Sequence, residues 1–281
     1  MPKPIDRPVF LLTGSGELEA ILRTIVDPPF AIQRVSHWAE LKRALTSAPQ
    51  TAICFADALG SVGSEKGLSE GLREVSRGHP LVAVVACAHV AECELEVFDA
   101  LRMWDVAEIL DFEKELSPAG VSRRLDLVKT VWAQRLFSRA LPRTLSARGR
   151  TLLEAVADVS ARGGYVTELA DALGISRGTV TRWSAAAGVP EPRRMFAWIR
   201  LLLAADLLER PDHSIESVAR LSGFTSAASL KSTSKTFTAL SPSELREKGP
   251  FETIAGLARA EFRAARETAR ASRQHKNSWY N

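Results

Sequence analysis

The C-terminal half of the sequence contains one short pattern twice. Ala170 is followed four residues later by Gly174, Ala219 is followed at the same distance by Gly223, and an apolar residue comes directly after each glycine. A small residue lets two helices approach closely, and glycine readily adopts the left-handed backbone of a tight turn. Each copy therefore predicts two short helices joined by a tight turn, which is a helix-turn-helix unit.

The sequence around each copy indicates where the helices lie. Ser176 is placed to cap the second helix of the first unit, which we expect over about residues 176–187. In the second unit, the corresponding helix should start near Ser226 and reach Phe237. Between the units, the apolar segment 193–210 predicts one long helix, which at 1.5 Å per residue spans roughly 27 Å. That length is close to the ~34 Å between successive major-groove faces on one side of B-DNA.

Five motifs extend this pattern along the C-terminal half. In chain order they are Leu169-Ala170-Asp171-Ala172-Leu173-Gly174-Ile175-Ser176, Thr181-Arg182, Arg200-Leu201-x-x-Ala204-x-x-Leu207-Leu208, Ser214-Ile215-x-x-Val218-Ala219-x-x-x-Gly223-Phe224-x-Ser226 and Leu240-Ser241-Pro242-Ser243-Glu244-Leu245-Arg246. Their order and spacing resemble the DNA-binding domain of the AraC/XylS family of transcription regulators over about residues 143–248. The sequence departs from the family pattern at four positions, which are Ser184 and Ser234 (usually phenylalanine), Ala239 (usually glycine) and Leu245 (usually aromatic).

The resemblance implies that the second helix of each unit enters the major groove of double-stranded DNA. It places at the DNA Ser176, Arg177, Gly178, Thr181 and Arg182 of the first unit, and Thr225, Ser226, Ala227, Ala228, Lys231, Ser232 and Lys235 of the second. An arginine such as Arg182 can bridge O6 and N7 of guanine, and a phosphate contact or a salt bridge is an equal alternative for it. We therefore expect a sequence-specific DNA-binding transcription regulator.

The distribution of charge agrees with this expectation. Residues 1–120 carry 11 Lys and Arg against 18 Asp and Glu, a net charge of −7, whereas residues 121–281 carry 26 against 15, a net charge of +11. A basic half of this kind suits a polyanionic partner, and nucleic acid is the most abundant one in a cytoplasm. Chance clustering of basic residues on solvated helices is the alternative that charge alone leaves open.

The N-terminal half alternates short apolar runs with helical patterns. We expect strands at 9–12, 30–35, 52–56, 81–86 and 106–112, with helices at 17–26 and 38–47 among them. Strands that alternate with helices predict a parallel sheet covered on both faces. The fold class expected for the whole chain is therefore α/β plus all-α, in which a flavodoxin-like, doubly wound domain precedes the helical DNA-binding domain.

The layout of this half resembles a two-component receiver domain, whose phosphoacceptor would fall at Asp57. The other pocket positions of that family hold different residues here, in chain order Thr13 and Gly14, then Cys87 and Ala88, then Phe112 or Glu113, with Lys114 out of register. Aspartyl phosphorylation needs a metal ion held by clustered carboxylates, and one carboxylate does not build that site. We expect a degenerate receiver used for contacts or for a signal, with Asp57 as a loop or cap residue. A response regulator controlled through Asp57 is the alternative.

Other chemistry in the sequence is sparse. Gly14-Ser15-Gly16 lacks the third glycine of a dinucleotide-binding loop, so we expect it to form a tight turn. Cys87, His89 and Cys93 supply only three soft ligands for a metal ion. The five histidines are scattered, so an enzyme in the α/β domain is the weaker alternative, and we expect no catalytic residue, cofactor or metal. Three cysteines without a Cys-x-x-Cys pair favour a reducing cytoplasm, and no apolar run reaches the ~20 residues that span a membrane.

The segments that flank the DNA-binding domain are both expected to be helical. The first has an apolar face with helical spacing, formed by Val121, Leu125, Val128, Trp132 and Leu136, within one helix over about 119–140. This face either packs on the sheet or forms a homodimer seam through residues 121–136. The second segment carries an arginine stripe, formed by Arg259, Arg263, Arg266, Arg270 and Arg273. The stripe contacts phosphate, docks on the acidic domain or is simply a solvated face. The predicted domains are therefore 1–118 (receiver-like), 119–142 (connector helix), 143–249 (DNA-binding) and 250–281 (basic helical tail).

Overall fold

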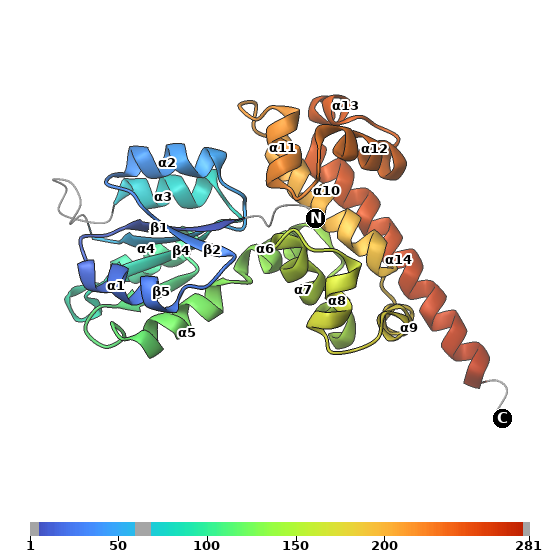
Figure 1. Ribbon diagram of the computed structural model, residues 1–281, viewed down its shortest axis with the longest axis horizontal. Coiled ribbons are helices and arrows are strands. Elements are labelled where there is room, and N and C mark those ends of the chain that lie inside the picture. The colour runs from blue at the N-terminus through green and yellow to red at the C-terminus, as the bar shows by residue number, and fades with distance from the viewer. Residues whose placement is uncertain (1–5, 60–68, 278–281) are drawn as a thin grey trace. The chain divides into compact units, whose positions relative to one another are not determined.

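The computed structural model describes residues 6–59 and 69–277. The chain divides into two compact units, one from Asp6 to Arg135 and the other from Leu136 onward. Figure 1 shows an α/β unit built on one sheet and a unit made only of helices. This combination confirms the expected fold class.

The α/β unit contains a five-stranded sheet in which every neighbouring pair is parallel. The strands are β1 (Arg7–Leu12), β2 (Phe30–Arg34), β3 (Ile53–Asp57), β4 (Ala83–Ala88) and β5 (Glu108–Asp111), in the spatial order β2-β1-β3-β4-β5. This is the order of flavodoxin-like folds. All five strands were predicted from the sequence. β4 begins two residues later than expected, because its pairing with β3 begins at Ala83, opposite Ile53.

Helices cover both faces of this sheet. They are α1 (Gly16–Ile25), α2 (Trp38–Ser47), α3 (Glu70–Gly78), the short 3-10 helix η1 (Val90–Glu92), α4 (Leu95–Met103) and α5 (Pro118–Val128). One apolar core joins α2, α3 and α4 to one face of the strands, and a second core joins α1 and α5 to the other face. Neighbouring strand residues such as Phe10 and Leu11 belong to opposite cores, which is why the strands read as continuous apolar runs.

The expected single connector helix is in fact two helices, α5 and α6 (Val131–Ala140). The break follows from a long-range hydrogen bond, because Nη2 of Arg7 donates to the Lys129 carbonyl at 2.9 Å. In an unbroken helix that carbonyl would accept from the Ala133 amide, which donates instead to the Thr130 carbonyl at 3.0 Å.

The apolar face of this connector is buried within the chain. Its five residues, Val121, Leu125, Val128, Trp132 and Leu136, are each at most 2% exposed. Val121, Leu125 and Val128 belong to the core between α1, α5 and the sheet. The homodimer seam through residues 121–136 is therefore wrong, because its side chains are not available to a second copy. The alternative, packing on the sheet, is what α5 does.

The helical unit is arranged around one long central helix. It contains α7 (Ala147–Ala161), α8 (Val166–Ala172), α9 (Arg177–Ala187), α10 (Pro192–Leu208), α11 (Ile215–Leu221), α12 (Ala227–Thr238), α13 (Pro242–Glu247) and α14 (Pro250–Asn277). α10 packs against each of the other seven helices of this set. In the described part of the chain, no helix combines the length and the apolar character that a membrane crossing requires.

The burial of α5 generates a prediction. Leu125→Ala should lower the free energy of unfolding of the α/β unit by about 2–4 kcal/mol, because it leaves a cavity in a filled core. Chemical denaturation at two protein concentrations measures this change. Leu127→Ala is the matched control, because Leu127 lies on the same helix and is 49% exposed. If the decrease in the free energy of unfolding caused by Leu125→Ala depended on protein concentration, this face would be a contact between two copies of the chain.

Candidate DNA-binding surface

The first helix-turn-helix unit consists of α8, a tight turn and α9. Gly174 has a φ of +63°, so the turn uses the left-handed conformation that the sequence predicted. The Ile175 amide donates to the Ala170 carbonyl at 3.0 Å and closes the turn. Ser176 is the N-cap of α9, and its Oγ accepts a hydrogen bond from the Thr179 amide at 3.2 Å. The turn and the start of the second helix are therefore fixed by local contacts.

The second unit repeats this geometry in α11 and α12. Gly223 has a φ of +85°, and the Phe224 amide donates to the Ala219 carbonyl at 2.9 Å, the same bond that closes the first turn. Ser226 is the N-cap of α12 and accepts from the Ser229 amide at 3.1 Å. The two copies of the sequence pattern thus form two turns of the same hydrogen-bonded structure.

The residues expected at the DNA lie at the surface of these two units. Eleven of the twelve are exposed and Ala227 is half-buried, the full set being Ser176, Arg177, Gly178, Thr181, Arg182, Thr225, Ser226, Ala227, Ala228, Lys231, Ser232 and Lys235. The opposite faces of α9 and α12 are held inward by Val180 and Leu230, each 1% exposed. Trp183 of α9 is only half-buried, and the Arg148 guanidinium lies 5.6 Å from the centre of one of its rings.

α10 joins the two units, and two charged residues within it are buried. Arg200 donates to the Gly164 carbonyl at 2.6 Å, and its guanidinium lies 4.4 Å from the centre of the Tyr165 ring. Burial lowers the pKa of Arg200 from its ordinary value, but an arginine starts so far above neutrality that it stays charged. Asp206 forms ion pairs with Arg139 of α6 at 2.8 Å and with Arg210 at 3.4 Å.

Three of the four departures from the family pattern are buried in the core of the helical unit, and the fourth, Ala239, is exposed. Ser184 and Ser234 are almost fully buried, and their hydroxyls donate to the carbonyls of Val180 at 3.0 Å and Leu240 at 2.7 Å. Ala239 ends α12 with a φ of +61°, a conformation that glycine adopts at lower cost. Leu245 is fully buried. The second unit is therefore packed in spite of these substitutions.

A buried histidine lies directly before the second unit. His213 precedes α11, and its carbonyl accepts from the guanidinium of Arg246 in α13 at 2.6 Å. Burial lowers the pKa of His213, and the nearby Arg210 acts in the same direction. Both effects favour the neutral form of the imidazole.

The receiver-like pocket positions meet at the carboxyl end of the sheet. Asp57 is the last residue of β3, so it is neither a loop nor a cap residue as expected. It is 8% exposed, and its Oδ2 accepts from the Gly14 amide at 3.2 Å. This bond ties β3 to the turn after β1. Asp111 ends β5, and its Oδ1 accepts from the amides of Val90 and Glu113. Both carboxylates are thus used to hold backbone turns.

The other candidate chemistry of the α/β unit is also structural. Ser15 caps α1 by accepting from the Leu18 amide at 3.1 Å, so the Gly14-Ser15-Gly16 segment is a helix-capping turn. Cys87 lies inside β4, and burial raises its pKa well above the ordinary value. Burial also raises the pKa of Cys54 to about 12. The His89 ring packs 5.4 Å from that of Phe112. Within residues 6–59 and 69–277, no three His, Cys, Asp or Glu side chains gather as a metal site requires.

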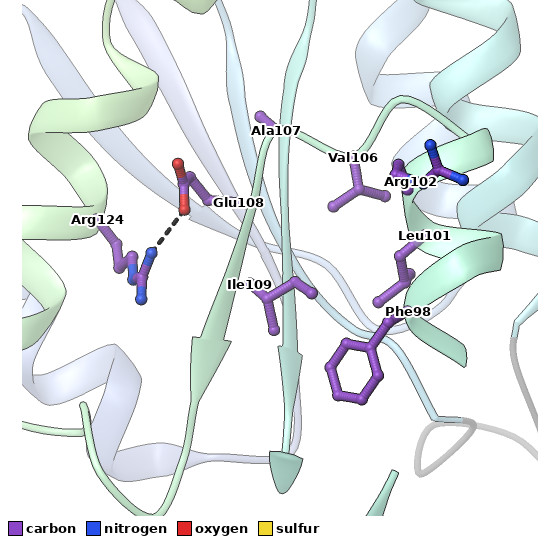
Figure 2. A pocket seen from close by; sticks show the side chains of 8 residues that line it. All are labelled: Phe98, Leu101, Arg102, Val106, Ala107, Glu108, Ile109 and Arg124. Carbon is purple, nitrogen blue, oxygen red and sulfur yellow. Dashed lines mark hydrogen bonds and ion pairs between the residues drawn. The ribbon is translucent and has the colours of Figure 1, made fainter. Parts of the chain in front are cut away.

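A shallow pocket of about 330 Å³ lies beside β5 at the edge of the sheet. Figure 2 shows that its apolar side chains, among them Phe98, Leu101 and Ile109, lie on the α4 side of the strand. On the other side, Glu108 forms an ion pair with Arg124 of α5 at 2.6 Å (Figure 2). Arg124 also binds Glu115, and this contact lowers the pKa of the Glu115 carboxyl. Two of the three charged side chains that line this pocket, Glu108 and Arg124, therefore bind each other.

The arginine stripe lies on a helix that is packed, not on a loose tail. α14 buries Phe251, Ile254, Ala255, Ala258 and Phe262. Within the stripe, Arg259 donates to Glu252 and to the Ala255 carbonyl, and Arg266 donates to Thr144. Arg263 and Arg270 are exposed, and the side chain of Arg273 lies outside the described residues. This packing was not predicted from the sequence, although the apolar residues recur at helical spacing.

Comparison with known families bears on these two units directly. Residues 169–248 match the family described as the helix-turn-helix domain. This part of the chain is an AraC-type helix-turn-helix domain. The protein is therefore a DNA-binding transcription regulator, because the matched segment covers both units and the helix that joins them. A comparison with curated proteins finds no match.

Three solved structures show a limited similarity to this chain, each with a TM-score below 0.5. RcsB of Salmonella typhimurium, a response regulator, is 16% identical over 70% of this chain and 98% of its own, with a TM-score of 0.36. XylR, a xylose-binding transcription activator, is 16% identical over 87% of this chain and 70% of its own, with a TM-score of 0.34. NtrX of Brucella abortus is 12% identical over 61% and 40%, with a TM-score of 0.36.

The pocket around Asp57 generates a second prediction. DNA binding and oligomeric state of the wild-type protein should not change when magnesium and acetyl phosphate are added, because Thr13 and Gly14 replace the acidic pair that would hold the metal. Asp57→Ala, and the isosteric Asp57→Asn as its matched control, should bind DNA like the wild type. Fluorescence anisotropy and sedimentation measure both properties. A response to acetyl phosphate that both variants abolish would show a working phosphoacceptor.

Proposed function

We propose that the protein regulates transcription by reading two successive major grooves of one DNA site, without catalytic activity. The observation that carries this proposal is the repetition of the same closed turn in two units joined by α10. At 1.5 Å per residue, the 17 residues of α10 span roughly 26 Å. This is the scale of one helical turn of B-DNA, about 34 Å. Two recognition helices at such a separation suit adjacent grooves on one side of the duplex.

The two recognition helices carry different chemistry, so we propose that they divide the reading of sequence unequally. α9 presents Arg177, Thr181 and Arg182, and arginine can form two hydrogen bonds with one guanine. α12 presents Ala228, Ser232 and two lysines, Lys231 and Lys235. Short side chains make few discriminating contacts, and lysine meets phosphate mainly as a point charge. The half-site under the first unit should therefore contain most of the sequence information.

For the α/β unit we propose a role in contacts or in receiving a signal, with no reaction at Asp57. The carboxylate accepts a hydrogen bond from the Gly14 amide. Cys87 and Ala88 stand where a receiver has its hydroxyl residue, and Phe112 or Glu113 stands where it has its lysine. The free thiols Cys54, Cys87 and Cys93 suit a reducing compartment such as the cytoplasm. Double-stranded DNA is then the partner of the helical unit alone.

If α9 reads bases and the lysines of α12 mainly meet phosphates, a substitution in each helix should have a different effect. Arg182→Ala should cost about 1–3 kcal/mol on the preferred site and relax specificity under the first unit, because a base contact is lost. Lys231→Ala should weaken binding to all sequences alike and flatten the slope of log K against log salt by about one unit, because one phosphate contact is lost. Anisotropy titrations on a preferred duplex and a scrambled duplex, at several salt concentrations, measure both effects.

The matched control for these variants is Lys42→Ala, which removes an exposed lysine of α2 in the other unit. It should leave affinity and salt dependence unchanged. The opposite pattern, with specificity lost in Lys231→Ala and kept in Arg182→Ala, would contradict the proposed division. A salt slope near zero for the wild type would contradict the phosphate contacts themselves.

A further inference from the structure

α14 extends beyond the segment that matches the helix-turn-helix family, which ends at residue 248. It nevertheless belongs to the core of the helical unit, because it lies along α10 and also contacts α9, α12 and α13. Figure 1 shows it running beside α10 and past the end of α9. Phe251 and Phe262, each 2% exposed, mark the length of the packed face. One helix therefore contacts both recognition helices.

The end of the first recognition helix lies directly on the backbone of α14. Gly188 ends α9 in the left-handed conformation, with a φ of +70°. A Cβ atom at this position would lie 3.1 Å from the Cα of Arg266 and 3.4 Å from the Cβ of Ala269. Glycine is therefore favoured at position 188 for two reasons, the positive φ of the residue and the short distance to the backbone of α14. A shift of α14 relative to α10 would displace the end of α9.

The second recognition helix is joined to α14 through a short chain of side chains. Phe237 of α12 packs edge-on against Trp198 of α10, with ring centres 4.9 Å apart. The Arg194 guanidinium lies 4.5 Å from the centre of the Phe237 ring. Arg194 donates from two nitrogens to the two carboxylate oxygens of Glu261 in α14. A paired donor of this kind fixes the plane of the guanidinium as well as its place.

We infer that α14 is a brace that sets the separation of the two recognition helices, with Glu261 as the positioning residue for the second one. Glu261 and Arg266 are five residues apart on one helix, roughly 7.5 Å along its axis, so the contacts to α12 and α9 share a rigid segment. The brace makes no contact with bases, so its effect is on the spacing between half-sites that the protein accepts. This inference rests on the proposed reading of two grooves.

The test compares DNA duplexes that differ only in half-site spacing. A duplex selected from a random library with the wild-type protein is used unchanged and with one base pair inserted between the half-sites. The wild type should bind the unchanged duplex more tightly, and the ratio of the two affinities measures spacing discrimination. Glu261→Gln should reduce that ratio by about threefold, the value of a partly exposed ion pair. Its affinity for a duplex with the second half-site scrambled should match that of the wild type.

Two further variants make the outcome decisive. Glu252→Gln is the matched control, because it removes the Arg259 ion pair of the same helix without touching Arg194, and its ratio should equal that of the wild type. Gly188→Ala, which disturbs the contact of α9 with α14, should reduce the ratio like Glu261→Gln. Equal ratios for Glu261→Gln, Glu252→Gln and the wild type would overturn the brace. Equal losses on all duplexes together with a lower melting temperature would also overturn it, because they would mark Glu261 as a stability contact only. A wild type without spacing discrimination would instead contradict the two-groove proposal.

Discussion

The burial of α10 is the constraint on which the helical unit depends. Fourteen of its seventeen residues are buried, so this helix is the core that both helix-turn-helix units share. Two of the buried residues are charged, and each has a defined partner, the Gly164 carbonyl for Arg200 and the Arg139 and Arg210 side chains for Asp206. Removing one partner of a buried charge leaves the other uncompensated and destabilises a fold strongly. The polar contacts of α10 therefore hold α6 and the turn before α8 against it.

The α/β unit keeps the sheet and helices of a receiver-like fold, whereas the residues at the polar pocket positions differ from those of that family. Its sheet and helices depend on apolar residues that alternate between two cores, and that pattern is complete. The pocket at the end of the sheet depends on a few polar residues, and these are replaced. Asp57 now accepts from the Gly14 amide, and Asp111 accepts from two amides of neighbouring turns. A carboxylate in such a place contributes to stability by satisfying buried backbone donors, which is a sufficient reason for it to be there.

Local features were predictable from the sequence, and long-range ones were not. The turns at Gly174 and Gly223, the cap at Ser176 and the start of a helix near Ser226 were predicted, because each depends on residues within a few positions. The break between α5 and α6 depends on Arg7, which lies 122 residues before Lys129, and no local pattern contains it. The packing of α14 was not predicted either, because Phe251 and Phe262 are buried in a unit whose central helix, α10, lies more than 40 residues earlier in the sequence. Eleven of the twelve residues expected at the DNA are exposed, and their contacts with DNA remain a proposal.

In the proposed function, the two helix-turn-helix units of one chain read two neighbouring major grooves of DNA. The most direct test is selection of bound duplexes from a random library with the full-length protein, followed by sequencing of the enriched pool. The account predicts two blocks of preferred bases whose centres lie about one helical turn, or 10–10.5 base pairs, apart, with the sharper block under α9. Enrichment of a single block, or no enrichment of any sequence, would contradict it.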